Sequence, residues 1–182
     1  KYTDAHNNRG STLLKLGKLE EAERSFFAAS KADPRNLAAF NNLALTRMNL
    51  GQFEGALESA NSALRLNPKH AEALNVRGLI LQALKRFEDA ARDLEQAIEI
   101  VPTHINAINN LALVLRDAGQ NEAALECLRA GLAVFPEHAG TFNNIALIYR
   151  DLRRYRDASD SAAMAKKIAP DYLSPYIGHC MT

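Results

Sequence analysis

Apolar residues recur along the chain at the spacing of α-helices, in short stretches separated by glycine, proline and polar residues. In residues 37–70, Phe40 and Leu43 mark the first apolar face, and Ala56 and Ala60 mark a second one further along. Residues three or four apart lie on the same side of a helix. The pattern therefore predicts two helices in this stretch.

The same two-helix pattern returns every 34 residues. Prolines mark the interval at Pro34, Pro68, Pro102, Pro136 and Pro170. We number the positions within each repeat from 1 to 34, call each position a place, and set this proline as place 32. Five repeats then align without a gap, at residues 3–36, 37–70, 71–104, 105–138 and 139–172. Such a period indicates units that bury their apolar faces against neighbouring units. We expect one domain, 1–182, in which residues 173–182 are a truncated sixth repeat or a capping helix.

Small residues and turn residues recur at fixed places. Places 8, 20 and 27 hold only alanine or glycine, which lets two helix backbones approach closely. The first helix is predicted to end at a glycine in three repeats, at Gly17, Gly51 and Gly119. Glycine is typical of this position because it tolerates the positive φ of the turn. Lys85 and Arg153 replace that glycine, so we expect strained or differently shaped turns there. The proline at place 32 ends the second helix.

Composition narrows the class of partner. The 22 basic residues nearly cancel the 21 acidic ones, which leaves a net charge of +1 and no electrostatic footprint for nucleic acid or an anionic membrane. No apolar run approaches the roughly 18 residues of a membrane span, so no membrane insertion is expected. Cys127 and Cys180 are predicted to be free thiols in a reducing compartment, which favours a cytoplasmic location. The sequence starts within the pattern and without Met, and we expect an excerpt from a longer protein.

The 34-residue period, the two-helix unit, the small places and the proline together resemble the tetratricopeptide repeat. Phe40 and Phe142 at place 4 and Tyr149 at place 11 match aromatic positions of that family. The resemblance covers 170 of the 182 residues. It implies an all-α, right-handed superhelix, an α-solenoid whose first helices line a concave groove that binds segments of other proteins.

Asparagines run along the first helices. Place 5 holds Asn7, Asn41, Asn75, Asn109 and Asn143, and place 6 holds Asn8, Asn42, Val76, Asn110 and Asn144. A side-chain amide offers a donor and an acceptor, as the peptide backbone does. The place 6 residues resemble the Asn ladder of O-linked N-acetylglucosamine transferase and SPINDLY-like tetratricopeptide proteins, and Val76 interrupts it. The alternative is that these amides bridge neighbouring helices or cap backbone groups.

Three further places complete the predicted peptide-binding surface, which we name the Asn face: places 5, 6, 9, 12 and 13. Place 9 holds Leu45, Leu79, Leu113 and Leu147, either as an exposed strip or buried between first helices. Place 12 changes from Leu14 and Met48 through Gln82 to Arg116 and Arg150, and place 13 holds Asp117 and Asp151 in the last two repeats. A ligand would meet an apolar part and a charged part, unless the charges form a solvated surface.

The histidines and the cysteine, which could bind a metal ion or take part in catalysis, do not occur at the spacing that a shared site requires. His70, His104 and His138 recur at place 34, one repeat apart and too distant to share a metal ion, and they are predicted to be loop residues. Cys127 stands at place 23, which elsewhere holds Ser or Asp and is predicted to point outward. No phosphate-binding loop or nucleophile motif occurs. We expect no catalysis, no metal and no cofactor.

The sequence thus predicts a non-enzymatic module that binds an extended peptide or protein segment on its Asn face. One alternative is a substrate-recognition segment of a larger enzyme, such as a glycosyltransferase. The other is a scaffold that associates with itself through the ends of the stack.

Overall fold

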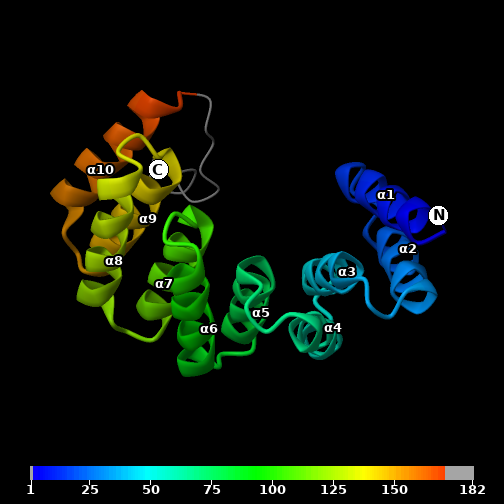
Figure 1. Ribbon diagram of the computed structural model, residues 1–182. Helices are drawn as coiled ribbons and strands as arrows, with labels where there is room; N and C mark the ends of the chain where they lie inside the picture. Colours follow the sequence, from blue (N-terminus) through cyan, green and yellow to red (C-terminus); the bar gives the residue numbers. More distant parts are fainter. Residues whose placement is uncertain (1, 171–182) are drawn as a thin grey trace. The chain divides into compact units, whose positions relative to one another are not determined.

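The computed structural model describes residues 2–170, which form ten α-helices and no strand (Figure 1). The helices are α1 (Tyr2–Lys15), α2 (Leu19–Ala32), α3 (Leu37–Asn49), α4 (Phe53–Leu66), α5 (Ala71–Ala83), α6 (Phe87–Ile100), α7 (Ile105–Asp117), α8 (Asn121–Val134), α9 (Ala139–Asp151) and α10 (Tyr155–Ile168). Each repeat contributes one pair, which confirms the predicted all-α solenoid. The predicted capping segment, 173–182, lies outside the described residues.

The helices group into two compact units, one with α1 to α6 and one with α7 to α10. Within each unit, a first helix contacts its own second helix and the first helix of the next repeat, while the second helix contacts that next first helix as well. Each repeat therefore buries its apolar surface on its neighbours, as a short repeat must. The single domain 1–182 stays a prediction.

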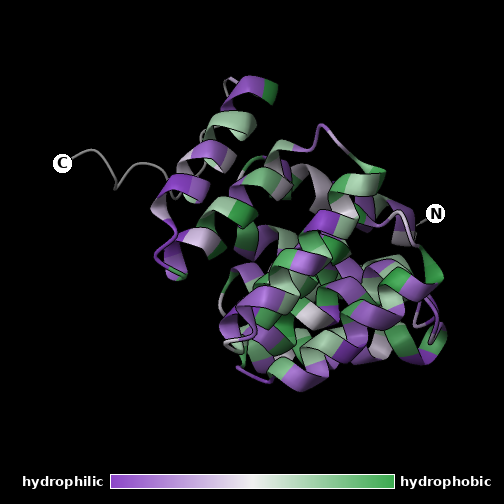
Figure 2. Cartoon of the chain, turned by 90° about the vertical axis from the view of Figure 1, so that its left-hand side faces the viewer, coloured by the Kyte–Doolittle hydropathy of each residue, from purple (hydrophilic) through white to green (hydrophobic). Residues whose placement is uncertain are grey.

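The small places are where helices meet. In the first four repeats the residue at place 20 is an alanine with no exposed surface. A Cβ added at Gly10 would lie 2.7 Å from a ring carbon of Phe26, and one added at Gly78 would lie 2.7 Å from Cγ of Leu94. Figure 2 shows hydrophobic and hydrophilic residues alternating along the helices, as expected when each helix has one buried face.

The turn after each first helix has one conformation throughout. Gly17, Gly51 and Gly119 have φ of 72°, 74° and 80°, and the residues that replace glycine, Lys85 and Arg153, have φ of 59° and 58°. Around Lys85, the Lys85 and Arg86 amides donate to the carbonyls of Gln82 and Leu81 at 2.8 and 2.9 Å, which is the pattern of a Schellman motif. The turns keep one shape, and the two non-glycine residues hold a left-handed backbone that is strained.

The second helices begin without a side-chain cap and instead carry acidic residues in their first turn. In three of them a basic residue precedes the helix and pairs with an acidic residue three places later; Arg86, helped by Arg92, holds the pKa of Asp89 below its ordinary value. These helices end two residues before the place 32 proline, as predicted.

Candidate peptide-binding face

The Asn face is carried by the first helix of every repeat. Contacts between α1 and α3, and between α3 and α5, set three of these helices side by side in the first unit, and α7 contacts α9 in the second unit. The hydrogen bonds of the asparagines differ between the units. We therefore describe each unit by itself.

In the second unit, two asparagines form a bond between helices. Nδ2 of Asn109 donates to the backbone carbonyl of Ile105 at 2.9 Å, and Oδ1 of Asn109 accepts from Nδ2 of Asn144 at 2.9 Å. The Ile105 carbonyl accepts only, so it sets the orientation of the Asn109 amide, and Asn109 in turn sets that of Asn144. This bond from place 6 to place 5 of the preceding repeat is the bridging alternative, and here the structure contains it.

The pair keeps unused hydrogen-bonding capacity at Asn144. Asn109 is 8 % exposed and both of its amide atoms are used within the protein. Asn144 is half-buried, and its Oδ1 is neither bonded nor buried. Its Nδ2 uses one of its two N–H groups on Asn109, so the unbonded acceptor and the second N–H remain.

In the first unit the place 6 amides are free. Asn8 is exposed and Asn42 is half-buried, and neither side-chain amide has a hydrogen bond among the described residues. Asn7 behaves differently, because its Nδ2 donates to Oδ1 of Asn36 at 3.4 Å while its Oδ1 is buried without a partner. Asn8 and Asn42 therefore offer both a donor and an acceptor.

The remaining place 5 and place 6 residues are more enclosed. Asn41 is 9 % and Asn75 is 4 % exposed, and Val76 is 1 % exposed within a core cluster that includes Ala44 and Ile80. Asn110 and Asn143 are half-buried, and Oδ1 of Asn143 is buried without a partner. Place 5 is buried in the three middle repeats and half-buried in the first and last, while every asparagine at place 6 is half-buried or exposed.

The leucines of place 9 are neither a fully exposed strip nor fully buried between first helices, which were the two alternatives from the sequence. Leu45, Leu79, Leu113 and Leu147 are all half-buried. Leu45 and Met48 pack at the margin of the core cluster around Ala44 and Ala56, so each shows part of its apolar surface on the Asn face. The row can contact a ligand without being a fully exposed strip.

The charges of places 12 and 13 form a partial network in the second unit. Arg116 pairs with Asp117 at 2.7 Å and lies 3.7 Å from Asp151 of the next repeat. Arg150 is half-buried and has no carboxylate partner among the described residues. Arg116 therefore belongs to a surface of paired Arg and Asp side chains, as the sequence predicted. The charge of Arg150 is not paired with a carboxylate among the described residues.

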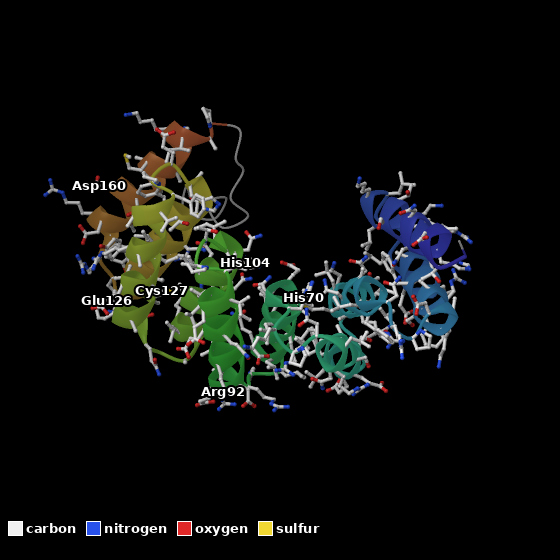
Figure 3. The ribbon with its side chains drawn as sticks, in the orientation of Figure 1. His70, Arg92, His104, Glu126, Cys127 and Asp160 are labelled. Carbon is white, nitrogen blue, oxygen red and sulfur yellow. The ribbon has the colours of Figure 1, made fainter. Side chains whose placement is uncertain are left out.

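The histidines of place 34 are helix caps, a role that the sequence did not reveal. Nδ1 of His70 accepts from the Ala73 amide at 3.1 Å, and Nδ1 of His138 accepts from the Thr141 amide at 3.1 Å. Asn36 does the same in the first repeat, where Oδ1 accepts from the Ala39 amide at 2.9 Å. Figure 3 shows His70 and His104, which immediately precede α5 and α7 as their N-cap residues. The signal was available, because asparagine is a preferred N-cap and occupies the same place.

The prediction that place 23 points outward is wrong. Ser25, Ser59 and Asp93 are at most 5 % exposed, and Cys127 is half-buried with Sγ 3.5 Å from the Ile108 carbonyl. Place 23 is three residues after place 20 and four before place 27, so it shares their buried side. The serines satisfy their hydroxyls on the preceding turn of their own helix, as Ser25 does on the Glu21 carbonyl at 2.9 Å.

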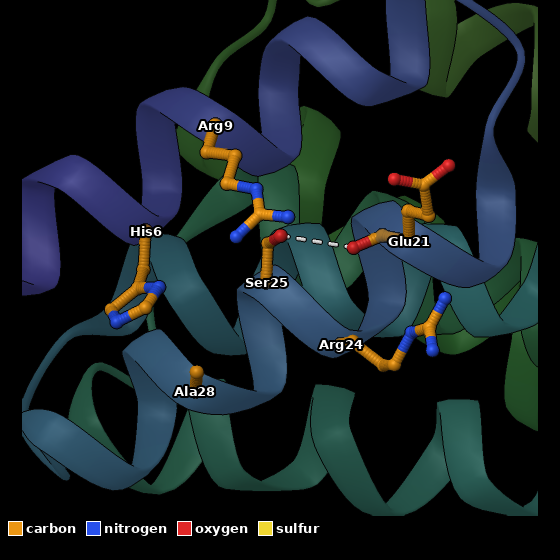
Figure 4. Close-up of a pocket in the computed structure, with 6 residues that line it drawn as sticks. All are labelled: His6, Arg9, Glu21, Arg24, Ser25 and Ala28. Carbon is orange, nitrogen blue, oxygen red and sulfur yellow. Dashed lines mark hydrogen bonds between the residues drawn. The ribbon is translucent and has the colours of Figure 1, made fainter.

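Other features of the described residues do not form a competing site. No group of three or more metal-ligating side chains occurs among them. A cleft of about 370 Å³ lies on the first helix pair, lined by His6, Arg9, Glu21, Arg24, Ser25 and Ala28 (Figure 4). It is open and lies outside the Asn face. Within the described part of the chain, every helix is too short or too polar to cross a bilayer.

Family profiles match most of the chain. A profile of the tetratricopeptide repeat matches residues 7–48 and 41–105, and a second tetratricopeptide repeat profile matches residues 81–140. No curated protein matches the sequence. The three profile segments run without interruption from residue 7 to residue 140, across helices of both units.

Several solved structures share this fold, and two of those named here are described as TPR proteins. A thermophilic TPR protein of Thermus thermophilus has a TM-score of 0.84 at 24% identity, with 94% of this chain and 93% of that chain covered. MamA from Desulfovibrio magneticus has a TM-score of 0.76 at 19% identity, with 96% and 98% covered. YrrB, described as a TPR protein with an unusual peptide-binding site, has a TM-score of 0.66 at 22% identity, with 92% and 86% covered.

Proposed function

Because the chain belongs to the tetratricopeptide repeat family, whose members are generally protein-interaction modules, we propose that it binds an extended polypeptide segment along the Asn face. The observation that carries the proposal is the pair of free amides at Asn8 and Asn42, on adjacent first helices. Each offers a donor and an acceptor to a peptide backbone without regard to the peptide's side chains.

The spacing of the helices suits an extended ligand. Packed helices lie about 8 to 10 Å apart, and an extended chain advances about 3.3 Å per residue. One asparagine therefore meets roughly every third residue of the ligand. A single hydrogen bond contributes only about 0.5 to 1.5 kcal/mol net, so affinity depends on several contacts acting together.

The neighbouring side chains favour a ligand of mixed character. In the first unit, Leu14, Met48 and Leu45 are half-buried and add apolar surface beside the amides. In the second unit, Arg150 has no carboxylate partner among the described residues, and its guanidinium can donate to a carboxylate. We expect the segment bound near Asn144 and Arg150 to carry an acidic side chain.

Selection from a library of unconstrained twelve-residue phage-displayed peptides tests this function. Peptides that bind the full chain should lose about tenfold or more in affinity for the Asn8→Ala, Asn42→Ala double variant, whose two substitutions lie on adjacent first helices of one unit. Asn121→Ala is the matched control, because Asn121 lies on α8, away from the Asn face. Equal losses in both variants, or in neither, would contradict binding at the Asn face.

The alternative that the asparagines bridge neighbouring helices has one observation in its favour, the bond between Asn144 and Asn109 that joins two repeats of the same chain. If this were the purpose of all the asparagines, Asn42→Ala would reduce the free energy of unfolding and leave peptide binding unchanged. The role of a substrate-recognition segment in a larger enzyme has no comparable support among these contacts.

A further inference from the structure

Asn41 holds a buried acceptor that nothing among the described residues uses. The residue is 9 % exposed, and its Oδ1 is buried without a hydrogen-bond partner. Its Nδ2 is also unbonded but is not buried. An unpaired buried polar atom costs about 1 to 3 kcal/mol, so it calls for an explanation.

Comparison with the second unit identifies the missing donor. Asn109 occupies the same place in its repeat, and its Oδ1 accepts from Asn144, which lies 35 residues further along the chain. The residue 35 positions after Asn41 is Val76, which has no donor and is 1 % exposed. The chemistry of Val76 therefore prevents the bond that closes this position in the second unit.

The missing donor at Asn41 has a different cause from the missing donor at Asn7 in the first repeat. Oδ1 of Asn7 is also buried without a partner, but the residue 35 positions later is Asn42, whose amide can turn to donate. At Asn41, no rotation of Val76 supplies a hydrogen. The donor that Asn109 uses in the second unit is therefore missing at Asn41, and a ligand N–H can take its place.

We propose that Asn41 grips the backbone of one ligand residue, with Oδ1 accepting its N–H and Nδ2 donating to its carbonyl. This inference rests on the proposed function and names its anchor point. The χ2 torsion of asparagine has a broad energy well, so the amide plane can turn and expose Oδ1, which is buried in the free protein, on the side where Nδ2 is accessible. Pairing the oxygen also removes the cost of leaving it unsatisfied in the free protein.

The surroundings of Asn41 set the class of ligand residue. Leu45 and Met48 follow it on α3 by four and seven residues and therefore lie along the same side of the helix. Both are half-buried, and the nearby cluster of Ala44, Val76 and Ile80 is apolar. The gripped residue is thus part of an uncharged, apolar segment. Val76 interrupts the predicted ladder and cannot donate to Asn41, so the Asn41 amide stays available to the ligand.

The test uses the capped heptapeptide GAALAAG titrated into the ¹⁵N-labelled full chain, with the side-chain amide resonances of the asparagines as the readout. Three variants are compared with the parent protein. Asn41→Ala removes the gripping amide, Val76→Asn supplies an internal donor, and Val76→Ala is the matched control that alters the same site without adding a donor. A peptide N-methylated at its central leucine lacks the N–H that Oδ1 would accept.

The proposal predicts that the Asn41 amide resonances shift and that Asn41→Ala and Val76→Asn each weaken binding about fivefold or more. Val76→Ala should stay within about twofold of the parent, and the N-methylated peptide should lose a similar fivefold. Unchanged affinity in Asn41→Ala, together with a loss in Asn42→Ala, overturns this inference and leaves the proposed function standing. If the heptapeptide shifts no resonance on the Asn face, the inference is overturned; the proposed function itself is contradicted only if phage-selected twelve-residue peptides shift none there either.

Discussion

Nδ2 of Asn144 donates to Oδ1 of Asn109 at 2.9 Å, across two adjacent first helices. This bond divides the asparagines of the Asn face into two groups. Those that are bonded within the protein, such as Asn109, hold repeats together. Those with unbonded amide atoms, such as Asn41 and Asn42, are the ones that we propose for ligand binding.

The division predicts unequal costs for the same substitution at equivalent places. Asn109→Ala removes two hydrogen bonds and leaves the Ile105 carbonyl without that donor, so it should lower the free energy of unfolding by about 1 to 3 kcal/mol. Asn41→Ala removes a buried oxygen that has no partner, together with its unfavourable contribution, so it should leave the free energy of unfolding unchanged or raise it by up to about 1 kcal/mol. Urea unfolding followed by circular dichroism measures both. Equal costs would show that burial, and not bonding, sets the contribution of place 5.

Gly78 should not accept a methyl group. Its added Cβ would lie 2.7 Å from Cγ of Leu94, so Gly78→Ala should destabilise the protein by about 1 to 3 kcal/mol. Gly55→Ala is the control, because its Cβ meets only the Arg47 side chain at 3.5 Å and alanine favours a helix; it should stabilise by up to about 1 kcal/mol. Adding Leu94→Ala to Gly78→Ala should cost less than the sum of the single changes, since it removes the clash. Strict additivity would contradict a steric cause.

The strained turns predict opposite effects of exchanging glycine and lysine. Lys85 has φ of 59°, so Lys85→Gly should stabilise the protein by about 0.5 to 1 kcal/mol. Gly51→Lys should destabilise it by about 1 kcal/mol, because φ there is 74° and no atom lies near an added Cβ. Thermal unfolding of both variants checks the sign. A loss of stability in Lys85→Gly would mean that the lysine side chain compensates for its backbone.

The histidine caps predict that asparagine can replace them. His70→Ala should cost about 1 kcal/mol, because the Ala73 amide loses its acceptor. His70→Asn should keep the free energy of unfolding within about 0.5 kcal/mol of the parent, since Asn36 caps α3 in the same way. Amide hydrogen exchange at Ala73 reports on the cap directly. Identical exchange in the two variants would contradict the capping role.

Arg77 of α5 forms an ion pair with the buried Asp93 of α6 in the same repeat, and it also bonds to Asn61 of the second repeat. Arg77 donates to Asp93 at 2.6 and 2.7 Å and to Asn61 at 3.0 Å, and Asp93 raises the pKa of Arg77 above its ordinary value. A raised pKa means that the contribution of the charged guanidinium is fully present below that ordinary value and is lost only at higher pH. Asp93→Ala should therefore cost about 2 to 4 kcal/mol, equally at about pH 7 and pH 9. A cost that changes between these two pH values would refute the assignment.

The helices were predictable because a strict period aligns the signals of five repeats. Pro34 and its equivalents mark the ends of second helices, and Gly51 and its equivalents mark the ends of first helices. Side-chain partners were less predictable, since they depend on the neighbouring repeat. The place of Asn109 was visible in the sequence, but its bond to Asn144 depends on how α7 and α9 pack. The error at Ser25 came from treating a polar residue as exposed, although its hydroxyl is satisfied within its own helix.

The most direct test of the central claim is a crystal structure of the full chain bound to a phage-selected twelve-residue peptide. We predict an extended peptide along the first helices, with backbone atoms within hydrogen-bond distance of the side-chain amides of Asn41 and Asn42. A peptide seated on the second helices, or one bound while both amides stay unpaired, would contradict the account.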